Sequence, residues 1–182
     1  IYTERAGTAI GAEEDTQICT SNGTTPNISE AISGEDVAET TSTELAYADV
    51  PKLYFSVGKA YRPNAVWLGG AVVLELLSGL KSTSGQPTLS FPGAANVVGD
   101  VPGATGMIFG RPVYEVPLAS GTLIFGDPAS YAFGRRDGIV ATVSDQVDFA
   151  SDLVSFKFTE RFDGRILDTV GLQQMAGLAT LT

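Results

Sequence analysis

Residues 121–144, GTLIFGDPASYAFGRRDGIVATVS, decide the fold of this chain. The apolar Leu-Ile-Phe run at 123–125 predicts a strand, because β-branched and aromatic side chains favour extended backbone. The Gly-Asp-Pro sequence at 126–128 ends that strand, since aspartate bonds its own backbone and proline cannot continue a ladder. The remainder of the stretch predicts two further strands, at 131–133 and 139–143, joined by a charged hairpin-like turn at 136–138. Together with the first strand they form a small β-meander.

The segments on either side of this stretch predict a mixed α+β fold. Toward the N-terminus we expect a weak helix at 1–14, followed by irregular backbone with one short strand at 28–43. Two further helices are expected at 48–57 and 70–81, with a strand at 65–68 between them. A short strand at 88–91 and a Gly/Pro-rich loop at 92–106 come next. Toward the C-terminus, residues 153–161 alternate in polarity and predict a strand. A turn at 162–165 and a final strand beginning at Ile166 complete the prediction.

Composition excludes several classes of function. The chain has 182 residues, enough for one domain or a compact pair of lobes, and its 11 basic and 21 acidic residues give a net charge of −10. Such a chain is a poor phosphate binder, because affinity for nucleic acids depends largely on lysine and arginine. The absence of histidine excludes Ser-His-Asp and Cys-His catalysis, and with Cys19 as the only cysteine it excludes an ordinary zinc site.

Three carboxylates, Asp127, Glu160 and Asp163, are candidates for the acid pair of a glycosidase. Each has a simpler structural explanation: Asp127 and Asp163 lie in predicted turns, and Glu160 is explained as a salt-bridged strand residue beside Arg161. The acidic clusters at 13–15 and 145–152 lack the spacing of a calcium loop. We therefore predict no catalytic residue, no metal site and no cofactor. An acidic, β-rich domain that binds or hydrolyses glycans is the alternative from another functional class.

Four segments in register carry a resemblance to a known family: YRPNAVWL at 61–68, GRPVYEVPL at 110–118, IFGD at 124–127 and ERFDG at 160–164. In this order and spacing, the chain resembles the C-terminal portion of tailed-phage major capsid proteins of the Hong Kong phage type. The resemblance implies a peripheral-type lobe at 1–90 and an axial-type, β-rich lobe at 91–182 whose final strands return toward the first. In that family the loop matched by residues 92–106 projects toward the capsomer axis.

The resemblance also implies a function and a set of contacts. It makes the chain a structural subunit that assembles into pentameric or hexameric capsomers in the host cytoplasm, and then into the virion shell. The shell encloses packaged DNA without binding it specifically, and no membrane is involved. Subunit contacts are expected at Phe91, Arg111, Arg135, Arg136, Arg161 and Arg165, with the arginines meeting acidic patches of neighbouring subunits.

The sequence departs from the family pattern at three points, which affect the expected size of the assembly and the expected crosslinking. The sequence opens on Ile1, and the family's N-terminal arm, extended hairpin loop and most of its spine helix have no counterpart here. We therefore expect a processed or truncated product that forms a monomer or a small ring. Asp152 stands at about the position of the asparagine that some members crosslink, so no self-crosslinking is expected. An encapsulin-like shell, which encloses protein cargo, is the alternative within the same fold.

Overall fold

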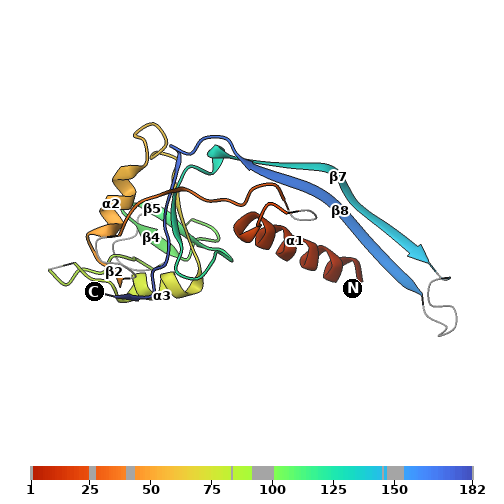
Figure 1. Ribbon diagram of the computed structural model, residues 1–182. Helices are drawn as coiled ribbons and strands as arrows, with labels where there is room; N and C mark the ends of the chain where they lie inside the picture. The colour runs from red at the N-terminus through yellow and green to blue at the C-terminus, as the bar shows by residue number, and fades with distance from the viewer. Residues whose placement is uncertain are drawn as a thin grey trace.

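The computed structural model describes residues 2–24, 28–39, 44–82, 84–91, 101–144, 146 and 154–181. Figure 1 shows a body of sheet and helices from which a long two-stranded ribbon extends, with helix α1 (Tyr2–Thr20) beneath the ribbon. The predicted mixed α+β class is confirmed. The predicted loop at 92–106 and the acidic cluster at 145–152 lie largely outside the described residues.

A six-stranded mixed sheet forms the body, in the order β1-β9-β6-β3-β5-β4. Its strands are β1 (Glu35–Asp36), β3 (Val66–Gly69), β4 (Gly106–Ile108), β5 (Arg111–Glu115), β6 (Leu123–Gly126) and β9 (Leu172–Met175). Strand β6, the apolar run that the sequence singles out, is buried throughout and pairs antiparallel with both β3 and β9. The sheet takes strands from both sides of residue 90, so the predicted boundary does not separate two sheets, and the division into two lobes stays a prediction.

Two helices and an aromatic cluster complete the core of the body. Helices α2 (Asp49–Ser56) and α3 (Ala71–Gly79) confirm the predicted helical spacing, and a short pair, β2 (Glu44–Leu45) with β10 (Thr180–Leu181), lies apart from the main sheet. Trp67 and Phe125 are fully buried, face each other in register on β3 and β6, and have ring centroids 4.3 Å apart. The stacked Tyr54 ring connects this pair to α2.

The ribbon corrects the predicted β-meander. Strand β6 ends at the Gly-Asp-Pro sequence, where the Asp127 side chain accepts a hydrogen bond from Ala129 N (2.9 Å) and caps the short 3-10 helix η1 (Pro128–Ser130). The chain then leaves the sheet as one long strand, β7 (Tyr131–Ser144), which pairs antiparallel only with β8 (Ser155–Ile166) among the described strands. The predicted stop after Phe125 is confirmed, but the meander is wrong.

The two turns predicted at 136–138 and 162–165 are also wrong, because both segments lie inside the ribbon. Gly138 does not adopt the positive φ that a tight type I′ hairpin turn requires. Instead, the register shifts between Arg135 and Asp137 and again between Asp137 and Val140, so β7 accommodates extra residues as bulges. Cross-strand pairing overrides the local turn preference of the Arg-Asp-Gly sequence.

Smaller differences have the same origin in strand pairing. Ile166 closes β8 rather than opening a final strand, and β9 begins six residues later at Leu172. The short strand predicted at 88–91 is reduced to one bridge, between Ser90 and Met107. The weak helix predicted at 1–14 runs on to Thr20, and the polar segment after it contains the short strand β1, as predicted.

Candidate assembly surface

The ribbon is the most exposed structured part of the described chain. Along β7, every residue from Phe133 to Val143 is solvent-exposed or nearly so, although many of them are apolar. Ile139, Val140 and Val143 are each at least half exposed. Isolated two-stranded hairpins are marginally stable in water, and exposed apolar patches mark sites of interaction. The ribbon is therefore the natural candidate for contact with other molecules.

The two faces of β8 differ in chemistry. Burial alternates along the strand, so that Phe158, Glu160 and Phe162 are partly covered while their neighbours are exposed. The covered face lies toward α1, and the open face carries Lys157, Arg161 and Arg165. The predicted alternation of this segment is confirmed, and it extends through the residues of the predicted turn.

A three-residue ion cluster ties α1 to the ribbon. Arg135 Nε donates to Oε1 of Glu14 (2.9 Å), Nη2 donates to Oε2 (2.5 Å), and Nε lies 3.1 Å from Oε1 of Glu160. The two carboxylate side chains are only 10% and 5% exposed, whereas that of Arg135 is 54% exposed. The hydrogen bonds that Arg135 donates to Glu14, together with the charges of Glu14 and Glu160, raise the pKa of Arg135 above its usual value. One guanidinium therefore serves two nearly buried carboxylates.

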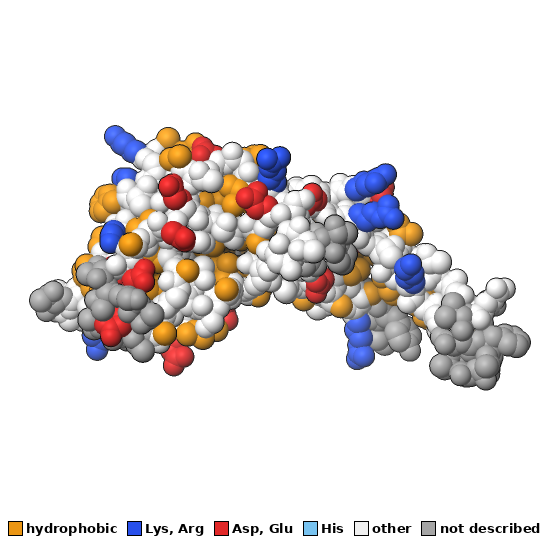
Figure 2. Space-filling model, in the orientation of Figure 1, with side chains coloured by type: hydrophobic (Ala, Val, Ile, Leu, Met, Phe, Trp, Pro, Cys, Tyr) orange, Lys and Arg blue, Asp and Glu red, His pale blue; other side chains and the backbone are white. Residues whose placement is uncertain are grey.

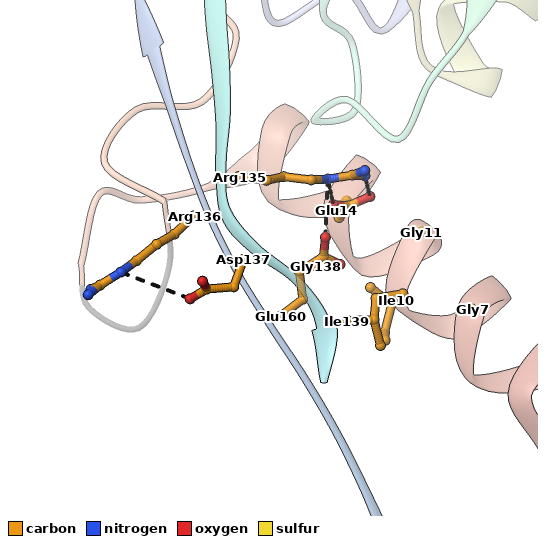
Figure 3. Close-up of a pocket in the computed structure, with 10 residues that line it drawn as sticks. All are labelled: Gly7, Ile10, Gly11, Glu14, Arg135, Arg136, Asp137, Gly138, Ile139 and Glu160. Atoms are coloured by element: carbon orange, nitrogen blue, oxygen red, sulfur yellow. Dashed lines mark hydrogen bonds and ion pairs between the residues drawn. The ribbon is translucent and has the colours of Figure 1, made fainter. Parts of the chain in front are cut away.

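Beyond this cluster, α1 and the ribbon diverge around an open hollow of about 570 Å³ (Figure 3). Its helix side is lined by Gly7, Ile10 and Gly11, and its ribbon side includes Gly138 and Ile139. A Cβ atom added at Gly7 or Gly11 would meet nothing within 4 Å. The two glycines therefore leave space here rather than permitting close packing.

The residues predicted to form subunit contacts fall into two groups. Four arginines gather on the ribbon: Arg135, Arg136, Arg161 and Arg165. Arg136 is 77% exposed and lies 4.0 Å from the exposed carboxylate of Asp137. The other two residues lie on the body, where Arg111 on β5 donates to the carbonyl of Pro63 and Phe91 is 48% exposed. Their contacts with neighbouring subunits stay a prediction.

The three candidate carboxylates each have a structural partner. Asp127 caps η1, and Glu160 pairs with Arg135 rather than with the adjacent Arg161. Asp163 accepts hydrogen bonds from Ser29 N (2.7 Å), Ser29 Oγ (2.8 Å) and Gly164 N (2.9 Å), which hold the pKa of its carboxyl below the usual value. These contacts account for the carboxylates without catalysis.

Two kinds of feature are absent from the described ranges. No group of three or more His, Cys, Asp or Glu side chains among these residues could hold a metal ion. No helix in this part of the chain is long and apolar enough to cross a membrane. Cys19 is half-buried, and burial together with the charge of Asp15 raises the pKa of its thiol to about 11, which leaves little of the reactive thiolate at neutral pH.

Sequence reasoning misses two features of this surface. The local pattern places Glu14 in a solvated acidic cluster, and no local signal links it to Arg135, 121 positions away. The same reasoning places the exposed β-branched side chains of β7 in the last strand of a small meander, at 139–143. No charged residue occurs from Gly138 until Asp145. This uncharged run is the sequence signal that could have identified β7 as an exposed edge strand.

Comparison with known proteins identifies the family to which the chain is related. The sequence model of the Phage capsid family matches residues 3–176, whereas no curated protein matches the chain. Similar solved structures include the capsid of an empty GTA particle computed with C5 symmetry (TM-score 0.70, 17% identity, 98% of this chain and 66% of that chain). They also include Mycobacterium phage Che8 (TM-score 0.61, 15% identity, 96% and 61%). A third is the SrpI encapsulin complex from Synechococcus elongatus PCC 7942 (TM-score 0.64, 13% identity, 97% and 64%).

At these identities the structural likeness shows a shared fold. The chain spans less than two thirds of the length of each of the three chains. The family match is independent of the structural likeness and covers nearly the whole sequence. The chain belongs to the Phage capsid family.

Proposed function

We propose that this chain is a shell subunit of a tailed-phage capsid, which assembles with its own copies into capsomers of five or six and then into a shell. Membership of a capsid family makes it a structural protein rather than an enzyme. Assembly takes place in the host cytoplasm, and the finished shell is part of the virion. No cofactor has a role in this function.

The exposed ribbon is the observation that carries the proposal. It extends well beyond the body in Figure 1 and presents Ile139, Val140 and Val143 to solvent at 50%, 52% and 58% exposure. Exposed β-branched side chains on an open strand promote pairing with other chains. A monomer gains nothing from this arrangement, whereas a subunit covered by neighbours buries these side chains.

The charge of the chain supports enclosure of DNA without adhesion to it. With a net charge of −10, the subunit repels a phosphate backbone overall. An encapsulin-like shell around protein cargo is the alternative that the fold allows, since the SrpI encapsulin has a TM-score of 0.64 with this chain. The family match favours the phage capsid.

The double variant V140S/V143S tests the proposal on the ribbon itself. We expect it to keep the circular dichroism and unfolding midpoint of the wild type, because both side chains are exposed, and to lose self-association in sedimentation velocity. The control is V72S, which changes a 45% exposed valine on α3 of the body and should leave association intact. Unchanged association of V140S/V143S would refute the role of the ribbon.

A further inference from the structure

Charge is divided unequally between the ribbon and the rest of the chain. Strands β7 and β8 together carry five basic and three acidic residues, while the rest of the chain carries six basic and eighteen acidic residues, three of them in the segment 145–152 between the two strands. Figure 2 shows a row of basic side chains along the ribbon. A projecting basic element on an acidic body fits the body of a second copy better than it fits its own.

The cations on the open face of β8 have no ion-pair partner among the described residues. Lys157 and Arg161 are both exposed, four positions apart on one face of the strand, and together line a shallow hollow of about 370 Å³. Asp137 is opposite Arg161 in the register, but its carboxylate pairs with Arg136. Asp163, on the same face, is engaged by Ser29. The charges of Lys157 and Arg161 are therefore available to another molecule.

A matching set of carboxylates lies at one edge of the six-stranded sheet. Strand β1 is the edge strand, both of its residues, Glu35 and Asp36, are exposed, and Glu39 follows them. Glu35 and Glu39 form no ion pair within the described chain, and Asp36 accepts only a hydrogen bond from Gln174 (2.7 Å). The nearby Lys52 donates to the carbonyl of Ala38 (2.5 Å) and not to these carboxylates.

We propose that Lys157 and Arg161 on the β8 ribbon of one copy dock on the acidic sheet edge, Glu35 to Glu39, of a second copy. Glu35 and Glu39 have the same four-residue spacing in sequence as the two cations, with Glu35 on β1 and Glu39 three residues beyond the end of that strand. In extended β8 this spacing separates the cations by about 13 Å. The two surfaces are different parts of the chain, so the contact is heterologous, and repeated contacts of this kind close into rings. The inference rests on the proposed shell function and names the surfaces that meet.

Packaged DNA is the other polyanion that such cations could meet. Two free cations on a chain of net charge −10 make a weak phosphate-binding surface, because affinity for DNA grows with the number of phosphates neutralised. The matched carboxylates of the sheet edge favour the second copy. Binding of duplex DNA is therefore an outcome that the test must include.

A charge-swap mixing experiment tests the contact. K157E/R161E reverses the ribbon, E35K/E39K reverses the sheet edge, and K59E/K81E is a control that makes the same change in net charge at exposed lysines of the body. Self-association of each is measured by sedimentation velocity at about 50 mM and about 500 mM salt, with circular dichroism to establish folding. We expect each swapped variant alone to associate about tenfold more weakly than wild type. The equimolar mixture of the two should associate about as strongly as wild type in each pairwise contact, because each variant supplies the surface that the other needs. The two variants can alternate around a ring of six, whereas a ring of five keeps one mismatched contact.

The inference is overturned by a mixture that associates no better than either swapped variant alone, or by a K59E/K81E control as impaired as K157E/R161E. It is also overturned by duplex DNA binding by the wild type that K157E/R161E abolishes. If the wild type associates and both swapped variants associate equally well, the assignment of surfaces fails while the shell function stands. If the wild type stays monomeric under all conditions, both fail.

Discussion

Arg135 on β7 and Glu14 on α1 form a two-point ion pair, with Nε 2.9 Å from Oε1 and Nη2 2.5 Å from Oε2. The same guanidinium lies 3.1 Å from Glu160 on β8. At its other end, α1 is held by main-chain contact, since Ile32 N donates to the carbonyl of Ile18 (2.6 Å). Arg135 is therefore a polar link between the ribbon and the middle of α1, just past the helix midpoint.

Replacing Arg135 by alanine should loosen α1 from its N-terminus up to Glu14, while the contact of Ile18 with Ile32 holds its other end. Two nearly buried carboxylates, Glu14 and Glu160, would lose their shared cation and repel each other. We expect amide hydrogens of residues 2–14 in α1 to exchange about tenfold faster, and those of the central strands β3 and β6 to exchange at the wild-type rate. Hydrogen exchange followed by mass spectrometry measures both regions in one experiment.

The neighbouring Arg136 provides the matched control. Its only ion pair among the described residues is with Asp137 at 4.0 Å, and both side chains are largely exposed, so R136A should leave exchange in α1 unchanged. Equal acceleration by R135A and R136A would show that the ribbon's overall charge, and not the pair with Glu14, holds the helix.

The parts of the fold and of the assembly surface that depend on neighbouring residues can be predicted from the sequence, whereas those that depend on residues far apart in the chain cannot. The strand that begins at Leu123, its stop at Asp127 and the helices α2 and α3 result from local patterns, and the structure confirms them. The ribbon could not be derived in the same way, because pairing with β8 extends β7 straight through the turn-like Arg-Asp-Gly sequence. The Glu14 to Arg135 link is equally non-local.

Replacing Tyr131 by phenylalanine should destabilise the base of the ribbon and change its alkaline sensitivity. The Tyr131 hydroxyl donates to the carbonyl of Glu30 (2.7 Å), and its loss should lower the free energy of unfolding by roughly 1–2 kcal/mol at neutral pH. Burial, with the nearby carboxylates of Asp163 and Glu30, raises the pKa of Tyr131 to about 12.

The raised pKa sets the sign of the pH effect. The folded protein favours the neutral phenol, so this contribution to stability is complete below the unfolded pKa of about 10 and is lost as pH rises toward about 12. Urea unfolding at several pH values from neutral to alkaline should show the difference between wild type and Y131F shrinking above about pH 10. A difference that stays constant across this range would contradict the assignment.

Cys19 should react slowly with thiol reagents in the folded protein. Its pKa of about 11 leaves far less thiolate at pH 8 than a free cysteine with a pKa of about 8.5 has. We expect alkylation by iodoacetamide to be at least about a hundredfold slower than in the urea-unfolded chain. The unfolded chain is the internal control, and comparable rates in the two states would show that α1 does not bury the thiol.

The mass of the purified chain in solution tests the central claim most directly. Light scattering over a range of concentrations, at low and high salt, should give about five or six times the 19.0 kDa mass of one chain, and this mass should fall as salt weakens the charged contacts. A mass of one chain at every concentration and salt would contradict the account, because the exposed ribbon would then have no partner among copies of the protein.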